Sequence, residues 1–146
     1  MNRRADIDGV ETVTLSLITD ATGRLVVAEQ GSEVPFVTRR VFVVQGVPEG
    51  TVRGNHAHGT CTELLVCLRG GVDVELTDGH TRKTVCLRSP DRGLIIPPLV
   101  WSTQRYVEPG SILMVLCDRP FEESEYIRDR DEFLRRRQLA GSRTPS

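Results

Sequence analysis

The sequence predicts an all-β, antiparallel domain that is followed by a single C-terminal helix. Short runs rich in valine, isoleucine and leucine recur between glycine, proline and aspartate residues, which is the pattern of strands and turns. Two connections, Asp20–Gly23 and Thr77–His80, consist of residues typical of hairpin turns. The predicted strands are Glu11–Ile18, Leu25–Glu29, Arg40–Val44, Arg53–His58, Glu63–Arg69, Gly71–Thr77, Lys83–Leu87, Gly93–Ile96 and Ser111–Cys117.

The hydrophobic period becomes helical only near the end of the chain, between Phe121 and Leu139. Four residues of this charged segment are spaced for one helical face: Tyr126, Ile127, Phe133 and Leu134. A chain of 146 residues fits one domain with a core of its own. We therefore expect a single domain over residues 11–139, with disordered segments at residues 1–10 and 140–146.

Composition and charge argue against several classes of protein. The formal net charge is −1 and no basic stretch is interleaved with aromatic residues, so we expect no binding to nucleic acid. The N-terminus lacks the apolar stretch of a secretory signal, and no segment reaches membrane-spanning length. We expect a cytoplasmic protein that does not contact a membrane. The four cysteines form no CxxC pair, which predicts buried free thiols.

The most informative stretch contains two of the three histidines of the chain. Five residues follow the order G-x5-H-x-H-x4-E-x6-G, namely Gly50, His56, His58, Glu63 and Gly70. This order resembles the first cupin motif at every fixed position. Histidines at i and i+2 of a strand point to the same face, and a carboxylate that enters the next strand can converge on them. The pattern favours a cupin-type antiparallel β-barrel, or jelly roll, with three polar groups meeting inside it.

Two kinds of chemistry suit such a trio, because neutral imidazole both ligates metals and titrates near neutral pH. Metal-dependent cupins usually add a histidine from a second motif, but here that region, Pro97–Ser102, ends in a serine. His56, His58 and Glu63 would then form a site with three ligands. The alternatives are proton transfer by the two imidazoles without a metal, and structural histidines that are hydrogen bonded within a half-buried sheet.

A longer set of motifs narrows the choice. It comprises Arg53-Gly54-Asn55-His56-Ala57-His58, Leu64–Leu68, Gly93–Pro98, Val100-Trp101 and Glu125–Arg128, with Phe133 at its end. Between about Ile18 and Phe133 the chain resembles the TDP-4-keto-6-deoxyglucose 3,4-ketoisomerase family, the WxcM-like sugar isomerase cupins. The resemblance implies a homodimeric cupin that uses neither metal nor cofactor and moves a ketone from C4 to C3 of a TDP-linked keto-deoxysugar.

The resemblance also implies roles for individual residues. His56 is expected to remove the C3 proton, and His58 to assist proton movement between the oxygens of an enediol. We expect Arg53 to clamp a phosphate or sugar oxygen with its planar guanidinium. Arg40, Glu63 and Trp101 are further predicted contacts with the substrate. Trp101 has two alternatives, core packing and dimer packing.

Several positions depart from residues that are common in this family. Family members commonly carry tyrosine near positions 42 and 43, lysine at 59, glutamine at 63 and histidine at 102. This chain has Phe42 and Val43, Gly59, Glu63 and Ser102 there. The loss of a tyrosine hydroxyl removes one proton donor, and the exchange of glutamine for glutamate adds a carboxylate beside two imidazoles. Three alternatives therefore stay open beside the ketoisomerase: an isomerase or epimerase of another nucleotide sugar, a metal-binding cupin enzyme, and a non-catalytic sugar-binding module.

Overall fold

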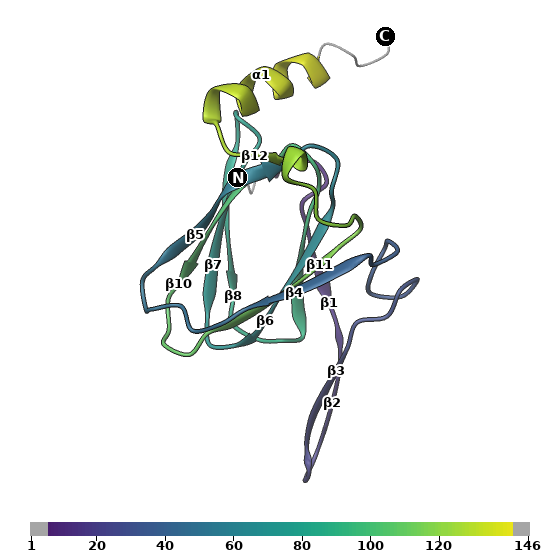
Figure 1. Ribbon diagram of the computed structural model, residues 1–146. Helices are drawn as coiled ribbons and strands as arrows, with labels where there is room; N and C mark the ends of the chain where they lie inside the picture. The colour runs from purple at the N-terminus through teal and green to yellow at the C-terminus, as the bar shows by residue number, and fades with distance from the viewer. Residues whose placement is uncertain (1–5, 142–146) are drawn as a thin grey trace, which may run out of the picture.

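The computed structural model describes residues 6–141, which form two facing antiparallel sheets and a C-terminal helix (Figure 1). The first sheet has the strand order β1 (Glu11–Thr14), β9 (Arg92–Ile96), β6 (Glu63–Arg69), β11 (Ile112–Cys117) and β4 (Arg40–Val44). The second has the order β12 (Tyr126–Ile127), β5 (Val52–His58), β10 (Trp101–Tyr106), β7 (Val72–Thr77) and β8 (Arg82–Leu87). Helix α1 (Arg130–Gly141) follows β12 at one end of the molecule.

The main hydrophobic core fills the space between the two sheets. Alternate residues of β7, Val72, Val74 and Leu76, are buried there together with residues of β6, β9 and β11. The residues between them point outward, as the pleat of a strand requires. This arrangement confirms the predicted all-β cupin fold with a C-terminal helix. The sheets remain separate in their hydrogen bonding and do not form one continuous cylinder.

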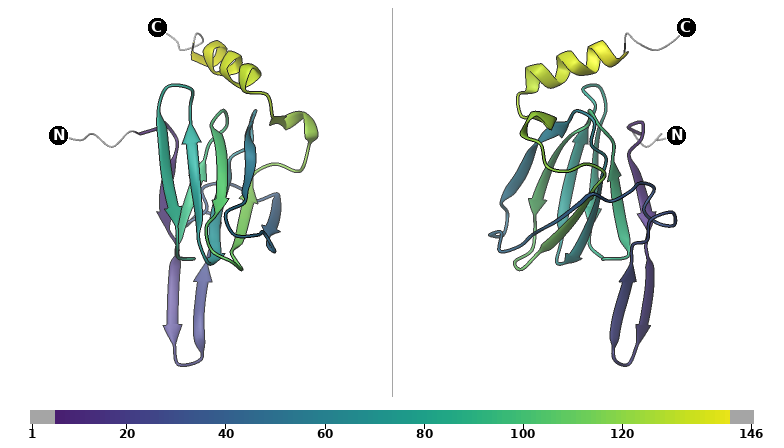
Figure 2. Two further views of the ribbon diagram at one scale, coloured as in Figure 1. Left: turned by 90° about the vertical axis from the view of Figure 1, so that its left-hand side faces the viewer. Right: turned by 45° about the vertical axis from the view of Figure 1, so that its right-hand side comes forward.

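The predicted strand Glu11–Ile18 is two strands in the structure, because the chain leaves the first sheet at Leu15. Before this point β1 pairs with β9, and after it β2 (Ser16–Asp20) pairs only with β3 (Gly23–Val27). The side chain of Leu15 is buried, and its amide donates a hydrogen bond to the carbonyl of Asp91. The β2–β3 hairpin extends away from the two sheets as a separate ribbon (Figure 2).

Strand β10, which joins β5 to β7 at the centre of the second sheet, is not among the predicted strands. Its middle reads Ser-Thr-Gln-Arg, so the apolar alternation on which the strand predictions relied is absent from it. The strand is stable because it is hydrogen bonded on both sides. Trp101 and Tyr106, its first and last residues, are both buried.

The predicted helix Phe121–Leu139 begins nine residues too early. A short 3₁₀ turn, Glu123–Glu125, and β12 occupy the first part of this segment, and α1 starts at Arg130. The start is fixed by Asp129, whose Oδ1 accepts hydrogen bonds from the amides of Asp131 and Glu132 at 2.8 and 3.1 Å. Tyr126 therefore belongs to a strand, and only the later residues of the predicted helical face lie on a helix.

The expected terminal disorder falls largely on residues 1–5 and 142–146, which lie outside the described residues. Within the described part, Ile7 packs in the main core and α1 continues to Gly141. The described residues contain no helix that is long and apolar enough to cross a membrane. All four cysteines are free thiols, and three of them are buried as expected. Cys86 is exposed, because it lies on the outward face of β8.

Helix α1 is attached to the second sheet mainly through Phe133, which is 0% exposed and packs with Trp101 at a ring distance of 5.6 Å. We expect Phe133→Ala to lower the free energy of unfolding by about 3–5 kcal/mol, because it leaves a cavity under the helix. The neighbouring Leu134 is 46% exposed, so Leu134→Ala should lower the free energy of unfolding by only about 0.5 kcal/mol. Urea unfolding of both variants measures the difference, and equal losses would contradict this account of helix docking.

Candidate active site

A β-bulge in β5 determines which side chains face the space between the sheets. His56 lies opposite Ser102 of β10, whereas the next residue of β10 lies opposite Gly54, so Asn55 is the extra residue. Gly54 and Asn55 both have positive φ angles, 91° and 55°. A Cβ on Gly54 would lie 3.1 Å from the carbonyl oxygen of Ser102, so glycine suits both the conformation and the space.

The bulge brings Arg53 to the same face of the sheet as the two histidines. In β10, the partner of Arg53 is Gln104, which itself lies opposite the core residue Val74. The partner of His56 likewise lies opposite the core residue Leu76. Residues opposite each other in an antiparallel pair point to the same side. Without the extra residue, the alternation of β5 would turn Arg53 outward.

His56 is half-buried at one end of the space between the sheets and is held in one tautomer. Its Nδ1 lies 3.1 Å from the carbonyl oxygen of Gly54, to which it donates, so Nε2 carries the lone pair of the neutral ring. Burial lowers the pKa of His56, and the neighbouring His58 lowers it further. The hydrogen bond to Gly54 and the charge of Glu63 oppose this shift. The result is an imidazole that is neutral and able to accept a proton near neutral pH.

His58 connects the second sheet to the first. It is 4% exposed, and its Nε2 lies 3.0 Å from Oε1 of Glu63 on β6, which is 5% exposed. Glu63 points inward because its partners in β9 and β11, Ile96 and Cys117, belong to the main core. Among the residues that the structure describes, Nδ1 of His58 has no hydrogen-bond partner. A buried polar atom of this kind is a ready contact for a polar ligand.

Arg40 and Tyr126 complete the site from strands at the two sheet edges. Nη2 of Arg40, on β4, donates a hydrogen bond of 2.9 Å to the hydroxyl of Tyr126, on β12, and lies 3.5 Å from Sγ of Cys117. The Tyr126 ring lies 4.6 Å from the ring of His58 and 5.0 Å from that of His56, between centroids. Sequence reasoning assigned Tyr126 to a helix. The capping pattern at Asp129 is the signal that could have shown it to precede the helix.

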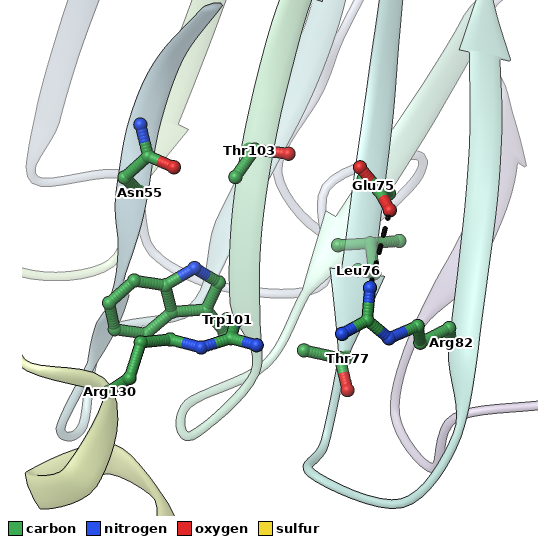
Figure 3. Close-up of a pocket in the computed structure, with 8 residues that line it drawn as sticks. All are labelled: Asn55, Glu75, Leu76, Thr77, Arg82, Trp101, Thr103 and Arg130. Atoms are coloured by element: carbon green, nitrogen blue, oxygen red, sulfur yellow. Dashed lines mark ion pairs between the residues drawn. The ribbon is translucent and has the colours of Figure 1, made fainter.

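Trp101 does not join these residues, although it was predicted to contact the substrate. It lies opposite Thr77 in β7, on the outer face of the second sheet, and is 5% exposed beneath α1. There it lines a pocket of about 290 Å³, with the guanidinium carbon of Arg130 5.1 Å from its ring centroid (Figure 3). Asn55, Thr103 and the Glu75–Arg82 ion pair line the same pocket. Trp101 therefore packs in the second sheet and under the helix, which was one of its two alternatives.

His56, His58 and Glu63 offer some of the ligands that a divalent cation needs. The ligand atoms of His56, His58 and Glu63 all lie within 4.8 Å of one another, and two imidazoles with one carboxylate suit zinc or iron. Ser102, which lies opposite His56, provides a hydroxyl where metal-dependent cupins place a fourth ligand. Three donors are therefore available, and the four-ligand set of those cupins is not reproduced by these residues.

Comparison with known proteins identifies the family. The family model described as WxcM-like, C-terminal (FdtA) matches residues 8–138. The chain belongs to this family. A curated relative, the TDP-4-oxo-6-deoxy-alpha-D-glucose-3,4-oxoisomerase of Aneurinibacillus thermoaerophilus, is 33% identical over 123 residues, which are 84% of this chain and 88% of the relative.

Two solved structures of sugar 3,4-ketoisomerases share the fold over nearly their whole length. The sugar 3,4-ketoisomerase QdtA of Thermoanaerobacterium thermosaccharolyticum, in complex with TDP, matches with a TM-score of 0.89 and 30% identity. The match covers 92% of this chain and 98% of QdtA. The TDP-quinovose 3,4-ketoisomerase WlaRB of Campylobacter jejuni gives a TM-score of 0.84 and 34% identity, covering 88% of this chain and 99% of WlaRB.

The balance of charges around His56 leads to a prediction about its titration. The carboxylate of Glu63 is one of the groups that hold the pKa of His56 up against burial. Glu63→Gln keeps the shape of the side chain and removes the charge, so we expect the pKa of His56 to fall further. The pKa of His56 is measured by following the imidazole NMR signals against pH, with exposed His80 as an internal reference. A pKa of His56 that rises or stays unchanged in the variant would contradict this balance.

Proposed function

We propose that the chain is a nucleotide-sugar 3,4-ketoisomerase that converts a TDP-4-keto-6-deoxyhexose to its 3-keto isomer. The chain belongs to the WxcM-like family, and its curated 3,4-oxoisomerase relative is 33% identical over 84% of the chain. Three solved 3,4-ketoisomerases share its fold at TM-scores between 0.84 and 0.89. The observation that carries the proposal is the pair His56 and His58 on one inward face of β5, next to each other at a ring distance of 5.0 Å.

His56 is the proposed base. The reaction removes a proton from C3, next to the C4 ketone, and passes through an enediol before a proton is returned to C4. The hydrogen bond from Nδ1 to Gly54 leaves Nε2 as the proton acceptor, and the lowered pKa of His56 keeps the ring neutral. A base held in one tautomer on a sheet interior needs little rearrangement to reach the C–H bond. The protonated ring can then return the proton to C4.

His58 is proposed to handle the proton of the sugar oxygens, with Glu63 orienting it. The carboxylate lies 3.0 Å from Nε2 and would stabilise an imidazolium as it forms. The other ring nitrogen, Nδ1, is buried and has no hydrogen-bond partner among residues 6–141. This geometry supports a contact between Nδ1 and a sugar hydroxyl.

Arg53 and Arg40 are proposed to hold the rest of the substrate. Arg53 follows the same inward face as the histidines but is exposed, which suits a guanidinium that binds the diphosphate near solvent. Arg40 is half-buried beside Tyr126, where its charge favours an oxyanion of the sugar. Both arginines are thus positioned for a negatively charged ligand in a protein whose net charge is near zero.

The free thiols support the expected cytoplasmic location, which we include in the proposal. Cys61, Cys67 and Cys117 are buried in the core without disulfide bonds. Such thiols persist in a reducing compartment.

Replacement of His56 by asparagine tests the reaction. Asparagine keeps an N–H for the carbonyl of Gly54 but cannot accept the C3 proton, so turnover of TDP-4-keto-6-deoxyglucose should fall by at least about 10²-fold. Product formation and incorporation of deuterium from the buffer into the sugar are measured by NMR. Binding of TDP, measured by calorimetry, should persist.

The matched control is His80→Asn, since His80 lies in an exposed turn and should be dispensable. Full activity of His56→Asn would place the base elsewhere. If the wild-type protein itself forms no 3-keto product and exchanges no deuterium, the ketoisomerase assignment is wrong.

A homodimer is also proposed, because the β2–β3 hairpin carries uncovered apolar side chains. Ile18 and Leu25 lie opposite each other on one face of the hairpin and are 57% and 59% exposed. A two-stranded ribbon is marginally stable in water by itself. Val41 and Val43, on the edge strand β4, are also about half exposed. A second copy of the chain that covers the hairpin would bury these residues.

Charge on the hairpin should therefore separate the dimer. Ile18→Glu combined with Leu25→Glu places four like charges at the contact of two copies, and sedimentation analysis should then show a monomer. Thr19→Glu, on the other face of the hairpin, is the control and should leave a dimer. A wild-type protein that sediments as a monomer at micromolar concentration would contradict the proposal.

A further inference from the structure

Tyr126 is fixed beside the two histidines by the short strand β12. It lies opposite His58 in the β12–β5 pair, with Ile127 opposite Ala57. The preceding residue, Glu125, anchors this strand to the loop after β5. Its carboxylate accepts hydrogen bonds from the amides of Thr60 and Cys61, and its own carbonyl accepts one from the amide of Gly59. Tyr126 is thus held by the backbone and does not depend on a flexible loop.

The hydroxyl of Tyr126 is arranged as a proton donor. Its oxygen accepts the hydrogen bond from Nη2 of Arg40 at 2.9 Å, so its own hydrogen remains available for another acceptor. Burial raises the pKa of Tyr126, although the guanidinium of Arg40 acts in the opposite direction. The phenol is therefore protonated at neutral pH. The side chain is only half-buried, so a ligand beside the histidines can reach it.

Phe42, the inward neighbour of Arg40 on β4, packs against the same guanidinium as Tyr126. The guanidinium carbon of Arg40 lies 5.3 Å from the ring centroid of Phe42 and 6.0 Å from that of Tyr126. The two rings thus share one cation. Tyr106, another tyrosine of the interior, is 0% exposed within the main core and cannot meet a substrate there.

We propose that Tyr126 is the catalytic acid that protonates the O4 oxygen of the substrate during isomerisation, with Arg40 stabilising the phenolate that results. This inference rests on the proposed ketoisomerase function and adds a residue to it. It follows from three contacts of one side chain, those with His56, His58 and Arg40.

The proton transfers balance as follows. His56 takes the C3 proton, the electrons of the C3–H bond form the C3=C4 double bond, and O4 takes the proton of Tyr126 to give the enediol. The O3 proton then passes to His58 as C3=O3 forms, and C4 takes the proton held by His56. The imidazolium of His58 finally returns its proton to the phenolate. The sugar has exchanged its ketone and hydroxyl positions, and all three side chains end neutral.

Arg40 makes this cycle feasible because a phenolate beside a fixed guanidinium needs no mobile counterion. The hydrogen bond is already formed in the resting protein, so the stabilising charge is in place before the proton moves. His58 lies near enough to close the cycle, with its ring centroid 4.6 Å from that of Tyr126.

Tyr126→Phe is the direct test, since it removes only the hydroxyl and keeps the ring beside the two histidines. We expect kcat for isomerisation of TDP-4-keto-6-deoxyglucose to fall by about 10²-fold or more, while the Kd of TDP changes by less than about threefold. Tyr106→Phe is the matched control, because it deletes another interior hydroxyl that lies outside the site. It should retain activity within about twofold.

A rescue experiment separates a chemical role from a structural one. Phe42→Tyr in the Tyr126→Phe background returns a hydroxyl to the same guanidinium. We expect the kcat of this double variant to be at least about tenfold higher than that of Tyr126→Phe. A merely structural role of Tyr126 would not respond to a hydroxyl on β4. The circular dichroism spectrum and unfolding midpoint of each variant are measured to verify that it is folded.

Three results would overturn the assignment of Tyr126. They are full activity of Tyr126→Phe, loss of TDP binding in a folded Tyr126→Phe variant, and failure of Phe42→Tyr to restore any turnover. Failure of the proposed function is recognised separately, because the wild-type protein would then form no 3-keto product.

Discussion

The β-bulge at Asn55 is the constraint on which the site depends. Arg53, His56 and His58 all face inward from β5. They do so only because Asn55 is an extra residue between Arg53 and His56. The conformation requires two successive positive φ angles, and Gly54 and asparagine at position 55 are the residue types that adopt them most readily. The same backbone presents the carbonyl of Gly54 to His56 and so selects its tautomer. Geometry and protonation state thus come from one local irregularity.

The two sheets meet at the site through polar contacts rather than through the apolar core. His58 and Glu63 belong to different sheets and are both nearly inaccessible to solvent. Arg40 and Tyr126 make the corresponding contact between the edge strands. Burying such groups is costly unless they are paired, so their pairing fixes how the sheets approach each other at this end. The substrate would enter a space that is already polar and already organised.

The positions of four ring side chains show what a local pattern can and cannot predict. The strand positions of His56 and His58 were predictable, because alternation with a period of two is a local property. Trp101 was expected at the substrate, but the pairing of β10 with β7 turns it toward α1. Tyr126 was expected on a helix, although β12 intervenes before α1. In both cases the partner strand or helix, and not the local pattern, determines the environment of the ring.

The sequence by itself determined the fold class, most of the strands, the family and the histidine pair. These features depend on alternation, on turn residues and on motif spacing, all of which can be identified within short stretches. Only the tertiary structure decided that Arg53 faces inward, that Trp101 faces outward and that Tyr126 reaches Arg40 across 86 positions of the chain. Such facts depend on strand register and on contacts between distant segments, and a shift of one residue reverses the face that every following side chain occupies.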